Sequence, residues 1–220
     1  MKRLICATAV ALTLVTAANS QTDPVAPLSV RVHDLTITSH TINVLATLAQ
    51  KYHVVIGLYG TFIGDDSHDI AISLKDGTLD EVFDAIVRAD PRLEWKQANN
   101  GAIHFIFLDT PLSLFDITVH SFDVEDPRRM QIADSLAQIP EIAGWLRDHR
   151  CDMYELIQGH FPNEWGKFAV HARDTPFSAV LDGIAARSGT YFWRAIQYSG
   201  VQCAINLGFP KDATPAQQQR

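Results

Sequence analysis

One amphipathic pattern occurs twice in this chain, 98 residues apart (170 − 72 = 98). Residues 72–95 read ISLKDGTLDEVFDAIVRADPRLEW, and residues 170–193 read VHARDTPFSAVLDGIAARSGTYFW. Aligned without a gap, residues 70–95 and 168–193 are identical at six positions, among them Asp84 with Asp182 and Trp95 with Trp193. Chance would give roughly one or two identities at average composition. The alignment predicts two copies of one structural unit, and convergent amphipathic patterning is the alternative.

Each copy predicts a strand, a helix and a hairpin. Ile70, Ile72 and Leu74 alternate with small residues, which is typical of a strand with one buried face. Thr78 stands three residues before Glu81, and this capping box marks the start of a helix. Apolar residues then recur at helical spacing over residues 79–87, and again over residues 177–185. Hairpins are predicted at residues 93–107 and 190–207.

The segments upstream of each copy complete the two units. In the first unit, residues 28–108, we expect strands at 29–32 and 53–57 and a helix from Ser39 to about Lys51. In the second unit, residues 114–207, we expect a strand at 115–119, a helix at 126–138 and a helical insert at about 140–160. No counterpart of the first unit's strand at 54–56 is expected. The predicted fold class is α+β, with tandem βαββαββ-type units and a diverged second unit.

The first unit resembles a known family, the short N-terminal domain of secretins and TonB receptors, called STN or N0. The family pattern is a helix ending in a Leu-Ala pair, a short apolar strand, an alternating strand, a Thr-capped helix and a closing hairpin. Five stretches fit this pattern: Leu48-Ala49, Val54-Val55-Ile56, Ile70-Ile72-Leu74, Thr78-Leu79 and Ile103-Phe105. The resemblance covers residues 28–108 well and residues 114–207 weakly.

The resemblance implies a periplasmic protein–protein contact module rather than a catalyst. Members of this family usually continue into a pore-forming or barrel domain, and nothing after residue 108 suits a barrel of that size. We therefore expect an adaptor module with an envelope protein as its partner, associated with a secretin, pilus or TonB-type system. The resemblance implies no cofactor, and no catalytic, cofactor-binding or metal-binding residue is assigned on this interpretation.

Residues 1–20 have the layout of a secretory signal peptide. Lys2 and Arg3 precede an apolar run from Leu4 to Val15, and small residues follow. The run is shorter than the roughly 20 apolar residues that a membrane-spanning helix needs. We expect cleavage near Ala18–Gln21, a periplasmic or secreted mature chain without a membrane span, and a disordered tail at residues 210–220.

The charge of the chain argues against nucleic acid as a partner. The formal net charge is −7. Loss of Lys2 and Arg3 with the signal peptide would make it −9 (−7 − 2 = −9). An acidic protein is not attracted to nucleic acid or to anionic lipid.

Two cysteines, Cys151 and Cys203, remain after the predicted cleavage. An oxidising compartment favours a disulfide between them, and two buried free thiols are the alternative. We predict the disulfide.

The region from His149 to His171 supplies the competing hypothesis, an exported enzyme or metal-binding protein. His149, Cys151 and His160 lie close in the sequence, and His160, Glu164 and His171 would make an acid–base set. Their spacing matches no common zinc or nucleophile motif. Trp95 and Trp193 occupy equivalent strand positions, for which a shared packing role is the expectation.

Overall fold

The computed structural model describes residues 28–62, 68–108, 113–127, 131–155, 167–198 and 203–209. The predicted signal peptide (1–20) and tail (210–220) lie outside these ranges. The described residues form five α-helices and ten strands, a mixed composition consistent with the predicted α+β class. In this part of the chain, no helix has the length and apolar character that crossing a membrane requires.

The first half of the chain contains seven elements. They are β1 (Arg31–His40), α1 (Thr41–Tyr52), β2 (Ile56–Phe62), β3 (Asp69–Thr78), α2 (Leu79–Ala89), β4 (Leu93–Gln97) and β5 (Ile103–Phe107). Helix α2 begins at the predicted capping box, where the Thr78 N–H donates to Glu81 Oε2 at 2.9 Å. Strand β2 begins later than predicted, because His53 takes a left-handed conformation (φ 49°) that ends α1.

The second half begins with a short 3₁₀ helix and continues with eight elements. They are η1 (Ser113–Asp116), then β6 (Thr118–Glu125), α3 (Ile132–Ala137), α4 (Pro140–Asp148), β7 (Cys151–Glu155), β8 (Ala169–Pro176), α5 (Phe177–Ser188), β9 (Phe192–Tyr198) and β10 (Cys203–Gly208). Helix α4 begins at Pro140 as predicted. A backbone N–H in the first turn of a helix has no partner within the helix, so proline, which lacks this N–H, suits the position.

Strand β7 corrects the helical insert that the sequence predicted at about 140–160. Residues 140–148 are helical, but Cys151–Glu155 form a strand, and residues 156–166 lie outside the described ranges. The side chains of Cys151 and Met153 are buried, whereas Asp152 and Tyr154 are exposed. This alternation of period two is that of a strand with one face in the core. The second half therefore has a strand between its first helices and β8, as the first half does.

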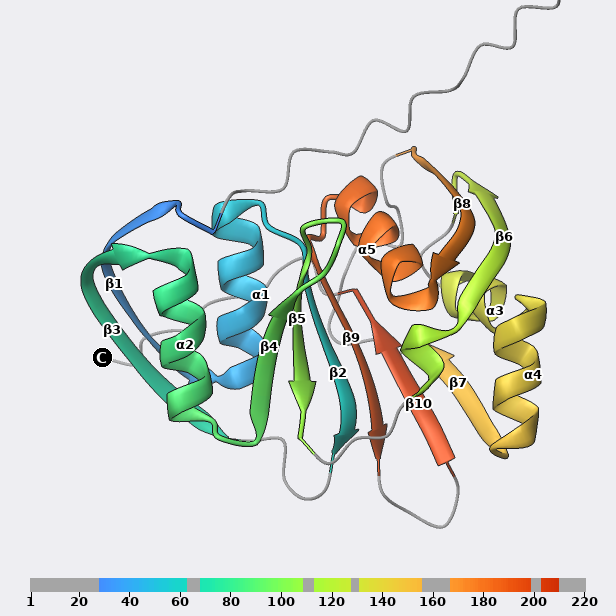
Figure 1. Ribbon diagram of the computed structural model, residues 1–220, viewed down its shortest axis with the longest axis horizontal. Coiled ribbons are helices and arrows are strands. Elements are labelled where there is room, and N and C mark those ends of the chain that lie inside the picture. Colours follow the sequence, from blue (N-terminus) through green and yellow to red (C-terminus); the bar gives the residue numbers. More distant parts are fainter. Residues whose placement is uncertain are drawn as a thin grey trace, which may run out of the picture.

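The strands form one six-stranded sheet and two ribbons. The sheet has the order β4-β5-β2-β9-β10-β7, and the ribbons are β1/β3 and β6/β8. In Figure 1, α1 and α2 lie beside the β1/β3 ribbon, and α3, α4 and α5 lie on the side of the β6/β8 ribbon. The halves meet where β2 runs parallel to β9 over seven residue pairs, from Ile56–Phe192 to Phe62–Tyr198. One continuous sheet thus joins both halves.

Two buried apolar clusters cross this junction. The cluster of the first half includes Phe192 and Ile196 from β9. The cluster of the second half includes Val55, Tyr59 and Ala102 from the first half. Because each core takes side chains from both halves, the halves bury one another's apolar surface.

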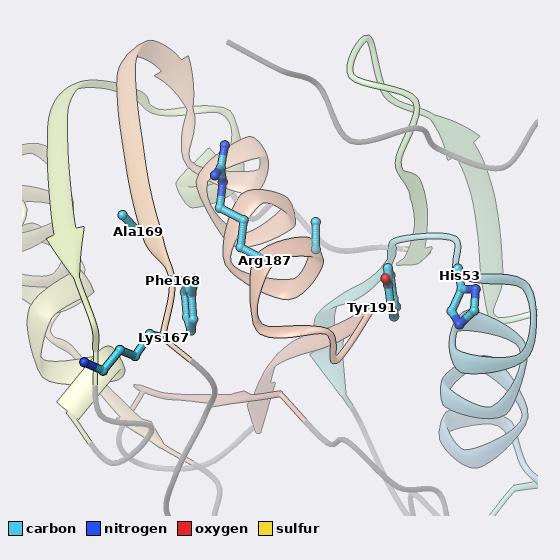
Figure 2. A pocket seen from close by; sticks show the side chains of 7 residues that line it. His53, Lys167, Phe168, Ala169, Arg187 and Tyr191 are labelled. Atoms are coloured by element: carbon cyan, nitrogen blue, oxygen red, sulfur yellow. The ribbon is translucent and has the colours of Figure 1, made fainter.

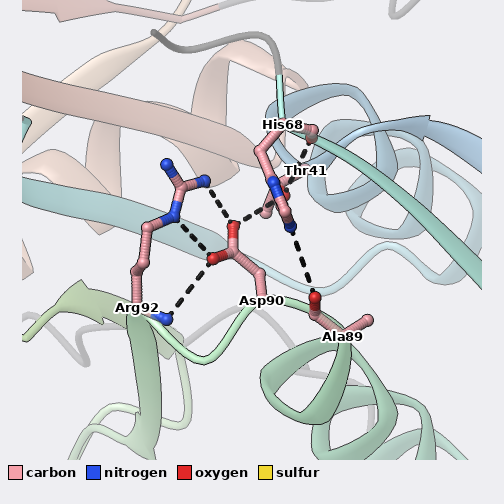
Figure 3. Close-up of polar contacts among 5 residues, drawn as sticks. All are labelled: Thr41, His68, Ala89, Asp90 and Arg92. Atoms are coloured by element: carbon pink, nitrogen blue, oxygen red, sulfur yellow. Dashed lines mark hydrogen bonds and ion pairs between the residues drawn. The ribbon is translucent and has the colours of Figure 1, made fainter. Parts of the chain in front are cut away.

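Within the first half, Asp90 connects the end of α2 to the start of α1 (Figure 3). Its buried carboxylate accepts hydrogen bonds from Arg92 Nε and Nη2, each at 2.8 Å, and from Thr41 Oγ1 at 2.9 Å. Burial by itself raises the pKa of Asp90, but the hydrogen bonds from Arg92 and Thr41 and the charge of Arg92 together hold it below its ordinary value. The carboxylate is therefore stabilised in its ionised form.

Asp90→Asn is expected to lower the free energy of unfolding at neutral pH by about 1.5–3 kcal/mol, the range for hydrogen bonds to a charged group. Because the folded-state pKa is depressed, this contribution is present above the unfolded-state pKa of about 3.9 and is lost as pH falls through the folded-state value. Urea unfolding of both proteins between about pH 7 and about pH 2 measures the difference. A gap in stability that does not shrink on acidification would contradict this role of Asp90.

Candidate functional site

The junction between β2 and β9 is built around Trp193. This indole is fully buried and stacks on Tyr59, with ring centroids 5.6 Å apart and an interplanar angle of 8°. Trp193 lies opposite Gly57 in the strand register, and a Cβ atom at Gly57 would collide with the indole ring. Glycine is therefore required at this point of β2 for the two halves to approach closely.

A buried carboxylate, Asp182 of α5, fixes the indole and binds the other half of the chain. Its Oδ1 accepts a hydrogen bond from Trp193 Nε1 at 2.7 Å, and its Oδ2 accepts one from Asn100 Nδ2 at 2.8 Å. His104 of β5 places Nε2 at 3.1 Å from both oxygens. An ionised carboxylate only accepts hydrogen bonds, so beside one His104 acts as the donor through Nε2. Three donors, two of them from the first half, thus converge on one carboxylate.

A crevice of about 470 Å³ opens beside this network. The β4–β5 hairpin forms one wall, the start of α5 forms the other, and Tyr59, His104 and Asp182 also line it. Both oxygens of Asp182 already accept hydrogen bonds from donors of the protein. The carboxylate is therefore suited to holding the two halves together rather than to taking a proton from a ligand.

Tyr59 contributes a neutral phenol to the crevice. Burial, followed by the negative charges of Asp116, Asp182 and Glu94, raises its pKa above the ordinary value for tyrosine. Each cause acts in the same direction, because burial and nearby negative charge both disfavour the phenolate. At neutral pH the hydroxyl group keeps its proton.

Gly57→Ala tests the close approach at the junction. The added methyl group would collide with the fully buried indole of Trp193 and force it away from β2. Overpacking of this kind costs about 1–3 kcal/mol. We expect a loss of that size in urea unfolding, with Gly144→Ala in α4 as the control, because a Cβ there meets only Arg147 Nη2 at 3.8 Å. Equal stabilities for the two variants would contradict the close approach.

A second, larger cavity of about 710 Å³ lies between the end of α1, β8 and α5 (Figure 2). Its described lining includes three basic side chains, those of His53, Lys167 and Arg187, and no acidic one. In Figure 2, Lys167 and Arg187 point in different directions. The two cations of the lining, Lys167 and Arg187, therefore do not converge on a common point of the cavity.

The structure confirms the predicted disulfide. Cys151 of β7 is bonded to Cys203 of β10, with 4.5 Å between their Cα atoms. The two cysteines are also direct partners in the parallel strand pair. The bridge connects β7, which lies at one end of the sheet, to its neighbour β10.

The residues of the competing metal or enzyme hypothesis have other partners. His149 Nδ1 lies 2.9 Å from the Trp145 carbonyl oxygen, His171 Nδ1 lies 2.9 Å from Asp123 Oδ1, and Cys151 is in the disulfide. His160 and Glu164 fall outside the described residues. Within the described ranges, no group of three or more His, Cys, Asp or Glu side chains is arranged to hold a metal ion.

His104 and Asn100 were not predicted as site residues, although the sequence contains a signal for His104. His104 stands between Ile103 and Phe105 in a predicted strand, and the structure shows all three to be buried. A buried polar side chain needs a hydrogen-bond partner, so a histidine in such a strand indicates a second polar group nearby. No family model matches this sequence, and a search of curated proteins returned no match.

Proposed function

We propose that this chain is an exported protein–protein interaction module made of two tandem STN/N0-like units. It acts in the periplasm or outside the cell as an adaptor, and its partner is a protein of a secretin, pilus or TonB-type envelope system. The resemblance of residues 28–108 to the STN family supplies the functional class. The arrangement of the strands supports the division into two units.

The observation that carries the proposal is that both halves have the same set of strand pairings. In the first half β1 pairs with β3 antiparallel, β2 with β5 parallel and β4 with β5 antiparallel. In the second half β6 pairs with β8 antiparallel, β7 with β10 parallel and β9 with β10 antiparallel. The order of the strands along the chain is also the same in the two halves. This correspondence supports a duplicated unit over convergent patterning.

Repeated side-chain contacts support the same conclusion. Trp95 Nε1 donates to Asp84 Oδ1 at 2.9 Å, and Trp193 Nε1 donates to Asp182 Oδ1 at 2.7 Å. In the ribbons, His33 lies 2.6 Å from Asp76, and His120 lies 2.8 Å from Asp174. The two tryptophans, the aspartates that they contact and the aspartates of the ribbons all stand at positions where the two aligned segments have the same residue.

The way the units join supports an interaction function. One unit binds the other by adding a strand to its sheet, which is a common mode of recognition between proteins. A unit that recognises its neighbour in this way presents the same kind of edge to other proteins.

In vivo cross-linking in the native host, followed by purification of the tagged protein from the envelope, tests the proposal. We expect one envelope protein to be recovered in about equal amount, and the purified chain to begin near Gln21. Retention of residues 1–20 in a protein found only in the cytoplasm would overturn the proposal. Stoichiometric zinc that is lost in His149→Ala would also overturn it and favour the metal-binding hypothesis.

A further inference from the structure

The two equivalent tryptophans have the same hydrogen bond but different surroundings. Each indole donates to an aspartate of the helix before its strand: Trp95 on β4 to Asp84, and Trp193 on β9 to Asp182. Trp193 is fully buried, because β2 and its residues Gly57 and Tyr59 cover the indole. Trp95 is only partly buried and rests against Phe83 of its own unit.

Strand β4 is an edge strand of the sheet. Strand β9 would also be an edge strand if the first half of the chain were absent. Among the described strands, β4 pairs with β5 alone, whereas β9 pairs with both β10 and β2. One of the two exposed large apolar residues in the described ranges, Leu108, lies beside the start of β4 and donates its N–H to the Arg92 carbonyl at 2.7 Å. The first unit thus retains an open copy of the surface that the second unit uses at the junction.

We propose that this open edge, formed by β4 with Trp95 and Asp84, binds a β-strand of a partner protein. The strand runs parallel to β4, as β2 runs parallel to β9. It carries glycine opposite Trp95 and an aromatic residue two positions later, the arrangement of Gly57 and Tyr59 in β2. This inference rests on the proposed interaction function and names the surface and the sequence class of its ligand.

A second copy of the chain fits this edge less well than a separate partner does. Among the described strands, only β2 contains glycine followed two residues later by an aromatic residue, and β2 is already paired on both sides. Strand β7, at the other end of the sheet, reads Cys-Asp-Met-Tyr-Glu and contains no glycine. None of the described strands of a second copy is therefore able to supply this segment, and the proposal assigns it to another protein.

A synthetic peptide with the sequence of residues 54–62 of this chain, followed by two lysines for solubility, is the probe. The protein is labelled with ¹⁵N at its tryptophan indoles, and the signals of Trp95 and Trp193 are assigned from Trp95→Phe and Trp193→Phe. We expect a saturable shift of the Trp95 signal. The peptide with Gly57→Val, whose side chain would collide with the indole, is expected to bind at least tenfold more weakly. Trp95→Ala is expected to weaken binding to the same degree, and Trp145→Phe in α4 is the control that leaves it unchanged.

Three results would overturn the inference. They are the absence of a saturable Trp95 shift, equal binding of the glycine and valine peptides, and a shift confined to Trp193, which would mean that the peptide had displaced β2. A concentration-dependent dimer that Trp95→Ala abolishes would overturn the assignment of the ligand to another protein. If Trp95→Ala still recovers the same envelope protein after cross-linking, the interaction function stands and this surface is wrong. If the peptide binds as expected but wild-type protein recovers no partner, the adaptor function is wrong instead.

Discussion

Asp182→Ala is expected to lower the free energy of unfolding by about 3–5 kcal/mol, because each buried donor left without an acceptor costs about 1–3 kcal/mol. The substitution leaves the donors of Trp193 and His104 buried without an acceptor. It also breaks the bond to Asn100, so two of the three lost contacts are between the halves of the chain. Urea unfolding followed by circular dichroism measures the loss.

Asp84→Ala is the matched control for this experiment. Asp84 occupies the equivalent position in the first unit and accepts the equivalent indole hydrogen bond, but it is exposed. A hydrogen bond at the surface contributes little, because water is able to replace either partner, so the control is expected to lose no more than about 1 kcal/mol. If both variants lost a similar free energy of unfolding, the hydrogen bond to tryptophan would account for the loss, and the contacts of Asp182 across the junction would contribute nothing.

Reduction of the disulfide between Cys151 and Cys203 is expected to cost about 4 kcal/mol in the chain-entropy model, less any strain that the bridge carries. The bridge closes a loop with a sequence separation of 52 residues, and long loops lose the most entropy when closed. It also holds β7, which among the described strands has β10 as its only partner in the sheet. Urea unfolding with and without a thiol reductant measures the effect.

The variant that combines Cys151→Ser and Cys203→Ser is the control for reduction. It is expected to be as unstable as the reduced wild type and to show no response to the reductant. Mass spectrometry of the purified protein, alkylated without prior reduction, checks the bond directly. Two alkylated cysteines would contradict the disulfide.

The starts of α2 and α4 could be predicted from the sequence because their signals are local. The helix start predicted at residue 126 was wrong, because α3 begins at Ile132. The contact between Thr78 and Glu81 spans three residues, and Pro140 marks the start of α4 by its own chemistry. The hairpin at residues 93–107 was also confirmed, since strands β4 and β5 are joined by a turn containing Gly101 at φ 85°. In each case one short window of sequence contains the whole interaction.

Strand β7 could not be predicted in the same way. Its five residues follow α4 after a turn at Arg150 and are too few to show a clear period. What makes them a strand is β10, which pairs with Cys151 through Cys203 much later in the chain. A preference that depends on a distant partner is not visible in a local window.

The site at the junction depends even more on distant partners. His104 and Asp182 come from different halves, and only the pairing of β2 with β9 brings them together. The alignment did identify Asp182 and Trp193 as positions shared with Asp84 and Trp95. It could not show that one pair is buried at an interface and the other lies at an open edge.

The pairing of β2 with β9 also has a consequence for how the chain folds as it is synthesised. The paired residues Ile56 and Phe192 are 136 positions apart (192 − 56 = 136), so β2 has no partner on that side until almost the whole chain has emerged. Contacts between such distant segments form slowly, and an unpaired strand edge is a site of aggregation. The first half therefore passes through a period in which the edge that contains Gly57 and Tyr59 is bare. We expect a chaperone that shields strand edges to raise the yield of the folded protein, and a chain that ends near residue 108 to need it most.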